Sequence, residues 1–187
     1  MKSPFCVFLF SMLLSVAKVV GADSPPSVPA AHLEAAKQAK EYFDRGNYRE
    51  AEKIYVSILA AEPNNLHALS NLGVVRFRSG KHKLAAEAFQ QAIAVAPHDA
   101  FSHCTLGIVF YSQGRYDDAI KSLKRAIELN PKNATAHNYL GITYSQKGMQ
   151  YEAAKELETA IELDPAYKRQ PEELPKQIPK EFRINDA

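Results

Sequence analysis

Histidine is the residue type here most able to do chemistry, and two of the six histidines stand 34 residues apart in similar surroundings. If His103 and His137 were brought together, their imidazoles could bind a metal ion. Zinc, however, needs three or four ligands, and Cys104 would point to a different face of its helix from His103. We therefore expect a structural role for both histidines, and we predict no metal site and no cofactor.

Other catalytic arrangements were not found in the sequence. It holds no phosphate-binding loop, no nucleophile elbow and no zinc-hydrolase helix motif. The acidic pairs Asp117–Asp118 and Glu172–Glu173 are typical of helix starts or solvated surface rather than of an acid and base pair. These patterns indicate a protein that is not an enzyme.

The charge of the chain gives no reason to expect nucleic acid. The formal net charge is +2, and Lys2 and Lys18 both lie in the apolar N-terminal stretch, so the remainder is balanced. Binding to nucleic acid depends on clustered lysine and arginine that neutralise phosphates. We expect no nucleic-acid partner.

The N-terminal stretch has the pattern of a secretory signal. Lys2 precedes an apolar run over residues 5–17, and two small-residue cleavage patterns end at Ala17 and Ala22. We predict a signal peptide over residues 1–22, with cleavage after Ala22 favoured over cleavage after Ala17. A retained membrane anchor is the alternative, but Lys18 interrupts the run well short of the roughly 20 residues that span a bilayer.

This signal predicts an exported protein, periplasmic or extracellular, with no integral membrane span after cleavage. Of the two cysteines, Cys6 would leave with the signal, so Cys104 would have no disulfide partner within the chain.

Glycine and proline recur at a fixed interval along most of the remaining chain. Each set is spaced by 34 residues: Gly46, Gly80, Gly114 and Gly148; Pro63, Pro97, Pro131 and Pro165. Three further columns keep this register: Ala39, Gly73, Gly107 and Gly141; Ala51, Ala85, Ala119 and Ala153; Tyr55, Phe89, Leu123 and Leu157. Self-similarity at this period, with small, bulky and proline positions in fixed order, resembles the tetratricopeptide repeat family.

The repeats run over residues 32–65, 66–99, 100–133 and 134–167. Apolar residues at three- and four-residue spacing predict two amphipathic helices in each repeat. The recurring glycines predict turns between the two helices, and Asn65, Asp99 and Asn133 are expected to cap the next first helix. Asn133 also begins an Asn-Ala-Thr glycosylation sequence, which would matter in a eukaryotic host.

The fold class predicted is therefore all-α, and the resemblance implies a curved solenoid of four repeats. Residues 23–31, with three prolines, are predicted to be a linker, and residues 168–187, with three more, an irregular tail. Apolar tail residues such as Phe182 would either pack on the second helix of the fourth repeat or engage a partner.

The resemblance places function on the concave surface, which the first helices line. The predicted peptide-binding groove consists of Lys40, Phe43, Ser70, Val74, Phe77, Phe101, Cys104, Ile108, Tyr111, Asn138, Ile142 and Ser145. Aromatic residues at helical spacing are also typical of a core, so Phe43, Phe77 and Tyr111 have an alternative role as packing between neighbouring first helices.

We accordingly predict a scaffold that binds a peptide segment of a protein partner; its oligomeric state is left open. The alternative is an accessory or regulatory subunit of an exported enzyme complex, with catalysis in the partner. Some members of the family bind chaperone carboxyl termini through lysine and asparagine side chains. Asn71 falls at one such column, but the third repeat holds Phe101 and Thr105 where basic and amide groups are needed, so we do not expect that mode.

Overall fold

A computed structural model describes residues 28–169 of the chain. The predicted signal peptide over 1–22, its cleavage sites and the tail from residue 170 onward lie outside the described residues.

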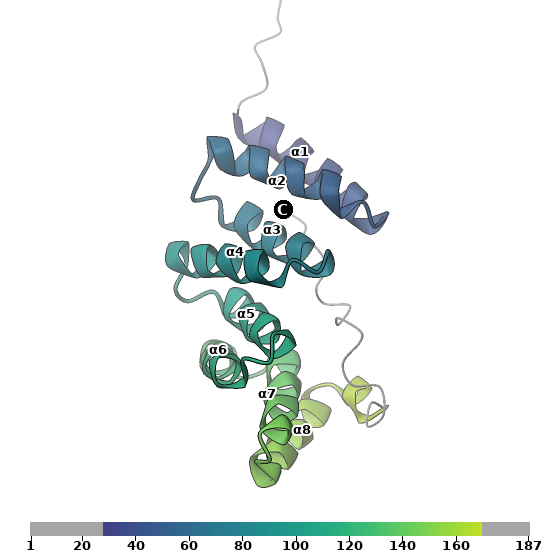
Figure 1. Cartoon of the computed structure of the whole chain (residues 1–187), viewed down its shortest axis with the longest axis vertical. Coiled ribbons are helices and arrows are strands. Elements are labelled where there is room, and N and C mark those ends of the chain that lie inside the picture. The colour runs from purple at the N-terminus through teal and green to yellow at the C-terminus, as the bar shows by residue number, and fades with distance from the viewer. Residues whose placement is uncertain (1–27, 170–187) are drawn as a thin grey trace, which may run out of the picture.

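Within the described range the chain forms eight α-helices and a short 3-10 helix, arranged as antiparallel pairs that follow one another along the long axis (Figure 1). The helices are α1 (Val28–Asp44), α2 (Tyr48–Ala61), α3 (Leu66–Arg78), α4 (His82–Val95), α5 (Ala100–Ser112), α6 (Tyr116–Leu129), α7 (Ala134–Gln146), α8 (Gln150–Leu163) and η1 (Pro165–Arg169). This is the all-helical solenoid that the 34-residue period predicts, with α1, α3, α5 and α7 as the first helices.

The caps and turns lie where the sequence predicts them. The side chains of Asn65, Asp99 and Asn133 accept hydrogen bonds from the backbone N–H three residues on, at 2.9, 3.0 and 3.0 Å. Gly114, between α5 and α6, has a φ of 71°, and its counterparts in the other repeats are also left-handed. Glycine adopts this conformation without the penalty that a Cβ brings, so it ends the first helix and lets the chain reverse.

The second glycine column allows each pair of helices to approach closely. A Cβ built on Gly107 would lie 2.6 Å from Leu123 Cγ and 3.2 Å from the carbonyl oxygen of Ala119. A Cβ on Gly73 would meet the ring of Phe89 at 2.7 Å. The bulky residue of the second helix therefore fills the space that the missing side chain leaves.

Stabilising contacts pass between neighbours in the stack. The second helices α2, α4 and α6 each pack against the first helix of their own repeat and that of the next, as α4 does with α3 and α5. Ion pairs reinforce this arrangement on α2, where Glu52 binds Arg76 at 3.0 Å and Lys81 at 2.6 Å. The buried core is consequently continuous from the first repeat to the fourth.

The predicted linker over 23–31 is wrong for its last four residues, because α1 already begins at Val28. Pro29 lies in the first turn of this helix. A proline is accepted there, since the backbone N–H that it lacks would have had no partner within the helix.

After α8 the chain enters η1, which lies where the first helix of a fifth repeat would begin. Tyr167 of η1 exchanges a hydroxyl–hydroxyl hydrogen bond of 2.8 Å with Thr135 in the first turn of α7. The described chain therefore ends beside α7. None of the described helices is both long and apolar enough to span a bilayer.

Candidate functional site

The four first helices present a common surface, called here the first-helix face and defined by the twelve residues of the predicted groove. The structure buries eight of them almost completely: Phe43, Ser70, Val74, Phe77, Cys104, Ile108, Asn138 and Ile142. Lys40, Phe101 and Tyr111 are half-buried, and Ser145 is exposed. A peptide on this face would therefore meet fewer of these side chains than an open groove would offer.

Contacts with neighbouring helices account for this burial in part: the Phe43 ring meets Tyr48 at the start of α2 and the Phe77 ring meets His82 at the start of α4. The hydroxyl groups of Ser70 in α3 and Ser102 in α5 lie 3.4 Å apart. The rings of Tyr111 in α5 and Tyr139 in α7 meet edge to face, with centroids 6.1 Å apart. Phe43 and Phe77 both belong to the continuous core, which favours a packing role for them. Peptide contact by the set as a whole stays a prediction.

Tyr111 borders a cavity of about 410 Å³ near the C-terminal ends of α3 and α5 in the middle repeats, called here the central cavity. It is lined by Phe77, His82, Ile108, Tyr111, Ser112, Gly114, Tyr116 and Tyr139. Three predicted groove residues, Phe77, Ile108 and Tyr111, are thus brought together. Lys40 and Ser145 belong to the first and last repeats and are not part of it.

The central cavity is lined by aromatic side chains together with several polar groups. Burial, followed by the neighbouring Tyr116, raises the pKa of Tyr111, so its phenol is neutral and can donate a hydrogen bond at physiological pH. His82 lies edge-on to Phe77 and its Nδ1 is 3.0 Å from the Ser112 hydroxyl. Such a cavity suits an apolar or aromatic side chain that carries a polar group.

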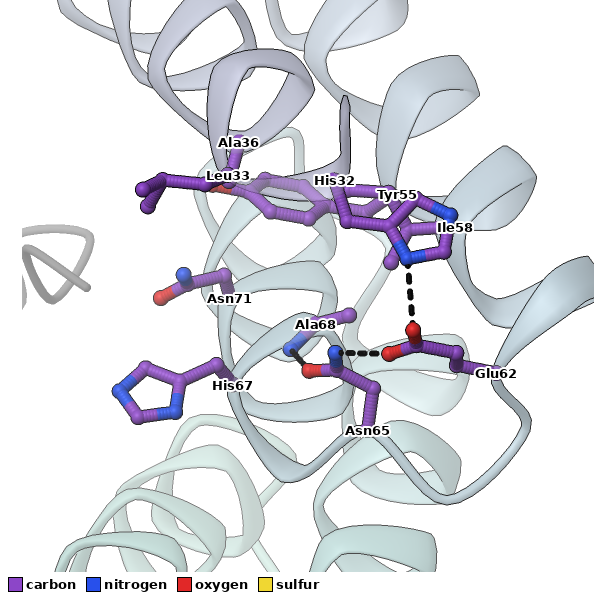
Figure 2. Close-up of a pocket in the computed structure, with 10 residues that line it drawn as sticks. All are labelled: His32, Leu33, Ala36, Tyr55, Ile58, Glu62, Asn65, His67, Ala68 and Asn71. Atoms are coloured by element: carbon purple, nitrogen blue, oxygen red, sulfur yellow. Dashed lines mark hydrogen bonds and ion pairs between the residues drawn. The ribbon is translucent and has the colours of Figure 1, made fainter. Parts of the chain in front are cut away.

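A second cavity of about 340 Å³, the N-terminal cavity, lies between the first and second repeats (Figure 2). Its lining consists of His32, Leu33, Ala36, Tyr55, Ile58, Glu62, Asn65, His67, Ala68 and Asn71. Glu62 is held on one wall by His32 at 2.8 Å and by the Asn65 amide at 2.8 Å. Because these two partners favour its charged form, the pKa of Glu62 is lowered, first by Asn65 and then by His32.

Tyr55 forms part of the same lining and has an unusual position for a polar residue. Its side chain is fully buried, and its hydroxyl lies near the Asn71 side chain without reaching the geometry of a full hydrogen bond. Burial raises its pKa, an effect that the nearby Asn71 side chain opposes. In the sequence this position is distinguished by its column, because the other repeats hold Phe89, Leu123 and Leu157 there, none of which carries a polar group.

Tyr55→Phe is therefore expected to keep the fold and to raise the free energy of unfolding by about 1 kcal/mol, because it removes a buried donor without creating a cavity. Urea unfolding followed by circular dichroism measures this change. A decrease of similar size would instead mean that the hydroxyl has a stabilising partner.

His103 and His137, which occupy equivalent positions in the third and fourth repeats, form hydrogen bonds to the loops before their helices. Nε2 of His103 lies 3.1 Å from the carbonyl oxygen of Pro97, and Nε2 of His137 lies 3.1 Å from that of Pro131. Each imidazole thus donates to the loop before its own helix, and Nδ1 of His137 also pairs with Glu156 at 2.6 Å. In the described range no three metal-ligating residues come together.

Comparisons with known proteins agree with this architecture. Tetratricopeptide repeat models match residues 36–100 and 134–167, and a model described as TPR repeat matches residues 107–148. Together the matches extend over most of the eight helices. The chain belongs to the tetratricopeptide repeat family.

Several solved structures share the fold. A crystal structure of MamA is 27% identical, with 75% of this chain and 82% of that one covered and a TM-score of 0.68. YrrB, described as a tetratricopeptide protein with an unusual peptide-binding site, is 25% identical over 73% of this chain and 71% of its own, with a TM-score of 0.64. The first such domain of Spaghetti (RPAP3), bound to an HSP90 peptide, is 25% identical over 63% and 93%, with a TM-score of 0.61. No curated protein matches the sequence at a significant level.

Proposed function

We propose that the protein is an exported, non-catalytic scaffold that binds a peptide segment of a partner protein on its first-helix face. Two similar structures support peptide binding, since one is described by its peptide-binding site and the other holds a peptide. Export rests on the pattern of residues 1–22 alone.

The observation that carries the proposal is the central cavity. It is the place on the first-helix face where an incompletely buried aromatic side chain, Tyr111, borders a volume large enough for a side chain of a partner. Tyrosine supplies a large contact area together with a hydrogen-bonding group, which makes it a frequent anchor of binding sites. We therefore propose a peptide with an apolar or aromatic anchor that enters this cavity.

Tyr111→Ala is expected to leave the helical fold intact and to weaken partner capture at least tenfold, the usual cost of losing a central aromatic contact. Affinity capture from the native compartment, with the chain lacking residues 1–22 as bait, measures this effect. Tyr151→Ala is the matched control, because Tyr151 on α8 is 82% exposed and lies outside both cavities.

Capture of the same partners by both variants at wild-type levels would contradict binding at the central cavity. Phe77→Ala cannot serve in this test, since Phe77 is only 6% exposed and its loss would destabilise the core. The captured partner also tests the alternative of an accessory subunit, which requires that partner to be an enzyme whose activity changes on binding.

A further inference from the structure

We propose that residues 170–187 bind along the first-helix face of their own molecule, with Leu174, Ile178 and Phe182 as anchors. This inference rests on the proposed function, because it requires that the first-helix face binds an extended peptide. Residues 170–187 would be one such peptide, supplied by the chain itself. A partner would then have to displace this internal segment.

The place where the described chain ends favours this path. Tyr167 occupies the position of the helix caps Asn65, Asp99 and Asn133 in the earlier repeats. Its hydroxyl is bonded to Thr135, which stands in the same column as Leu33 and Phe101 on the first helices. The chain thus leaves the fourth repeat beside a first helix, at the edge of the first-helix face.

The sequence beyond this point does not predict a fifth first helix. Pro171, Pro175 and Pro179 follow one another at four-residue intervals, and each would remove a helical hydrogen bond and clash with the preceding turn. Proline also restricts its own φ and biases the preceding residue towards extended backbone. A segment of this kind binds as an extended peptide at a small entropic cost.

The spacing of the apolar residues fits the spacing of the repeats. In an extended backbone of β type four residues cover about 13 Å and return the side chain to the same face, and packed helices lie about 10 Å apart. Leu174, Ile178 and Phe182 are each separated by four residues, so successive anchors would reach successive repeats. The whole of residues 170–187 would cover about 55 Å, more than the roughly 30 Å from the fourth first helix to the first.

The receiving surface is mixed where it is open: Lys40 and Ser145 are its polar residues, and three apolar or aromatic side chains are accessible beside them. Phe101 and Tyr111 on α5 are half-buried, and Leu33 on α1 is 41% exposed. These three side chains lie on first helices, and Tyr111 and Leu33 border the central and N-terminal cavities respectively. Burial of the three tail anchors against them would remove apolar surface from water on both sides.

The test uses the chain over residues 23–187 and a fluorescein-labelled synthetic peptide of residues 170–187. Ile178→Asp combined with Phe182→Asp should release the internal segment, so this variant is expected to bind the peptide at least tenfold more tightly than wild type in fluorescence anisotropy. Gln177→Asp combined with Asn185→Asp adds the same charge beside the anchors and should behave like wild type. Ile178→Ser combined with Phe182→Ser gives a second release variant without added charge.

Equal affinity of wild type and both release variants, or no binding to any of them, would overturn the inference. Adding Tyr111→Ala to the release variant should abolish peptide binding, and undiminished binding would place the segment elsewhere. If the peptide fails to bind while partner capture still depends on Tyr111, the tail inference fails and the proposed function stands. If the peptide binds but no partner is captured in a Tyr111-dependent manner, the proposed function fails and residues 170–187 are a permanent cover of the solenoid.

Discussion

Gly107→Val is expected to lower the free energy of unfolding by more than about 3 kcal/mol, because its side chain would enter space already filled by α6. A Cβ at this position lies 2.6 Å from Leu123 Cγ and 3.2 Å from the Ala119 carbonyl oxygen, and that oxygen belongs to a helix backbone that cannot move alone. Valine adds two further carbons to this clash. Urea unfolding followed by circular dichroism measures the loss, and hydrogen exchange should show it first in α5 and α6.

Gly114→Ala is the control for this prediction. Nothing lies within 4 Å of a Cβ built on Gly114, so alanine there faces only the cost of the left-handed conformation at φ 71°, about 1 kcal/mol. If Gly107→Val cost no more than Gly114→Ala, the close approach of α5 and α6 would not be a requirement of the fold.

Phe89→Ala should lower the free energy of unfolding by about 3–5 kcal/mol, the usual cost of removing a fully buried aromatic ring. Phe89 has no exposed surface, fills the space opposite Gly73 and meets Phe101 edge to face with centroids 6.4 Å apart. Its loss would leave a cavity between the second repeat and α5. Thermal and urea unfolding both report this change.

Gln90→Ala provides the comparison, because Gln90 is the next residue of α4 and is exposed. Its substitution is expected to change stability by less than about 0.5 kcal/mol. A loss for Phe89→Ala as small as this would show that the fourth helix repacks around the missing ring.

The fold could be predicted from the sequence because a few positions in each repeat depend on local chemistry alone. Gly80 and Gly114 are needed where the backbone turns left-handed, and Asn65 and Asp99 are needed where helix N–H groups lack partners. These requirements hold in each repeat independently, so the 34-residue period shows them directly.

The candidate site was less predictable, because exposure on the first-helix face depends on how neighbouring repeats pack. The helical period places Val74 and Ile108 on that face, yet in the packed stack they are only 1% and 2% exposed. The start of α1 at Val28 is not evident from the sequence, because proline generally opposes helix and is accepted only in the first turn. The N-terminal cavity could not be predicted from the sequence, because it forms only where α1, α2 and α3 pack together. No single repeat contains all three helices.

The packing of each repeat only on its neighbours has a mechanical consequence. A force that pulls on the two ends of residues 28–169 loads the junctions between repeats in series, because within this range each repeat packs mainly on its neighbours in sequence. Each 34-residue repeat that yields would release about 115 Å of extended chain. Under load the protein should therefore lengthen in discrete steps, one for each repeat that unfolds. When the force is removed it should shorten again as each repeat refolds against its neighbour.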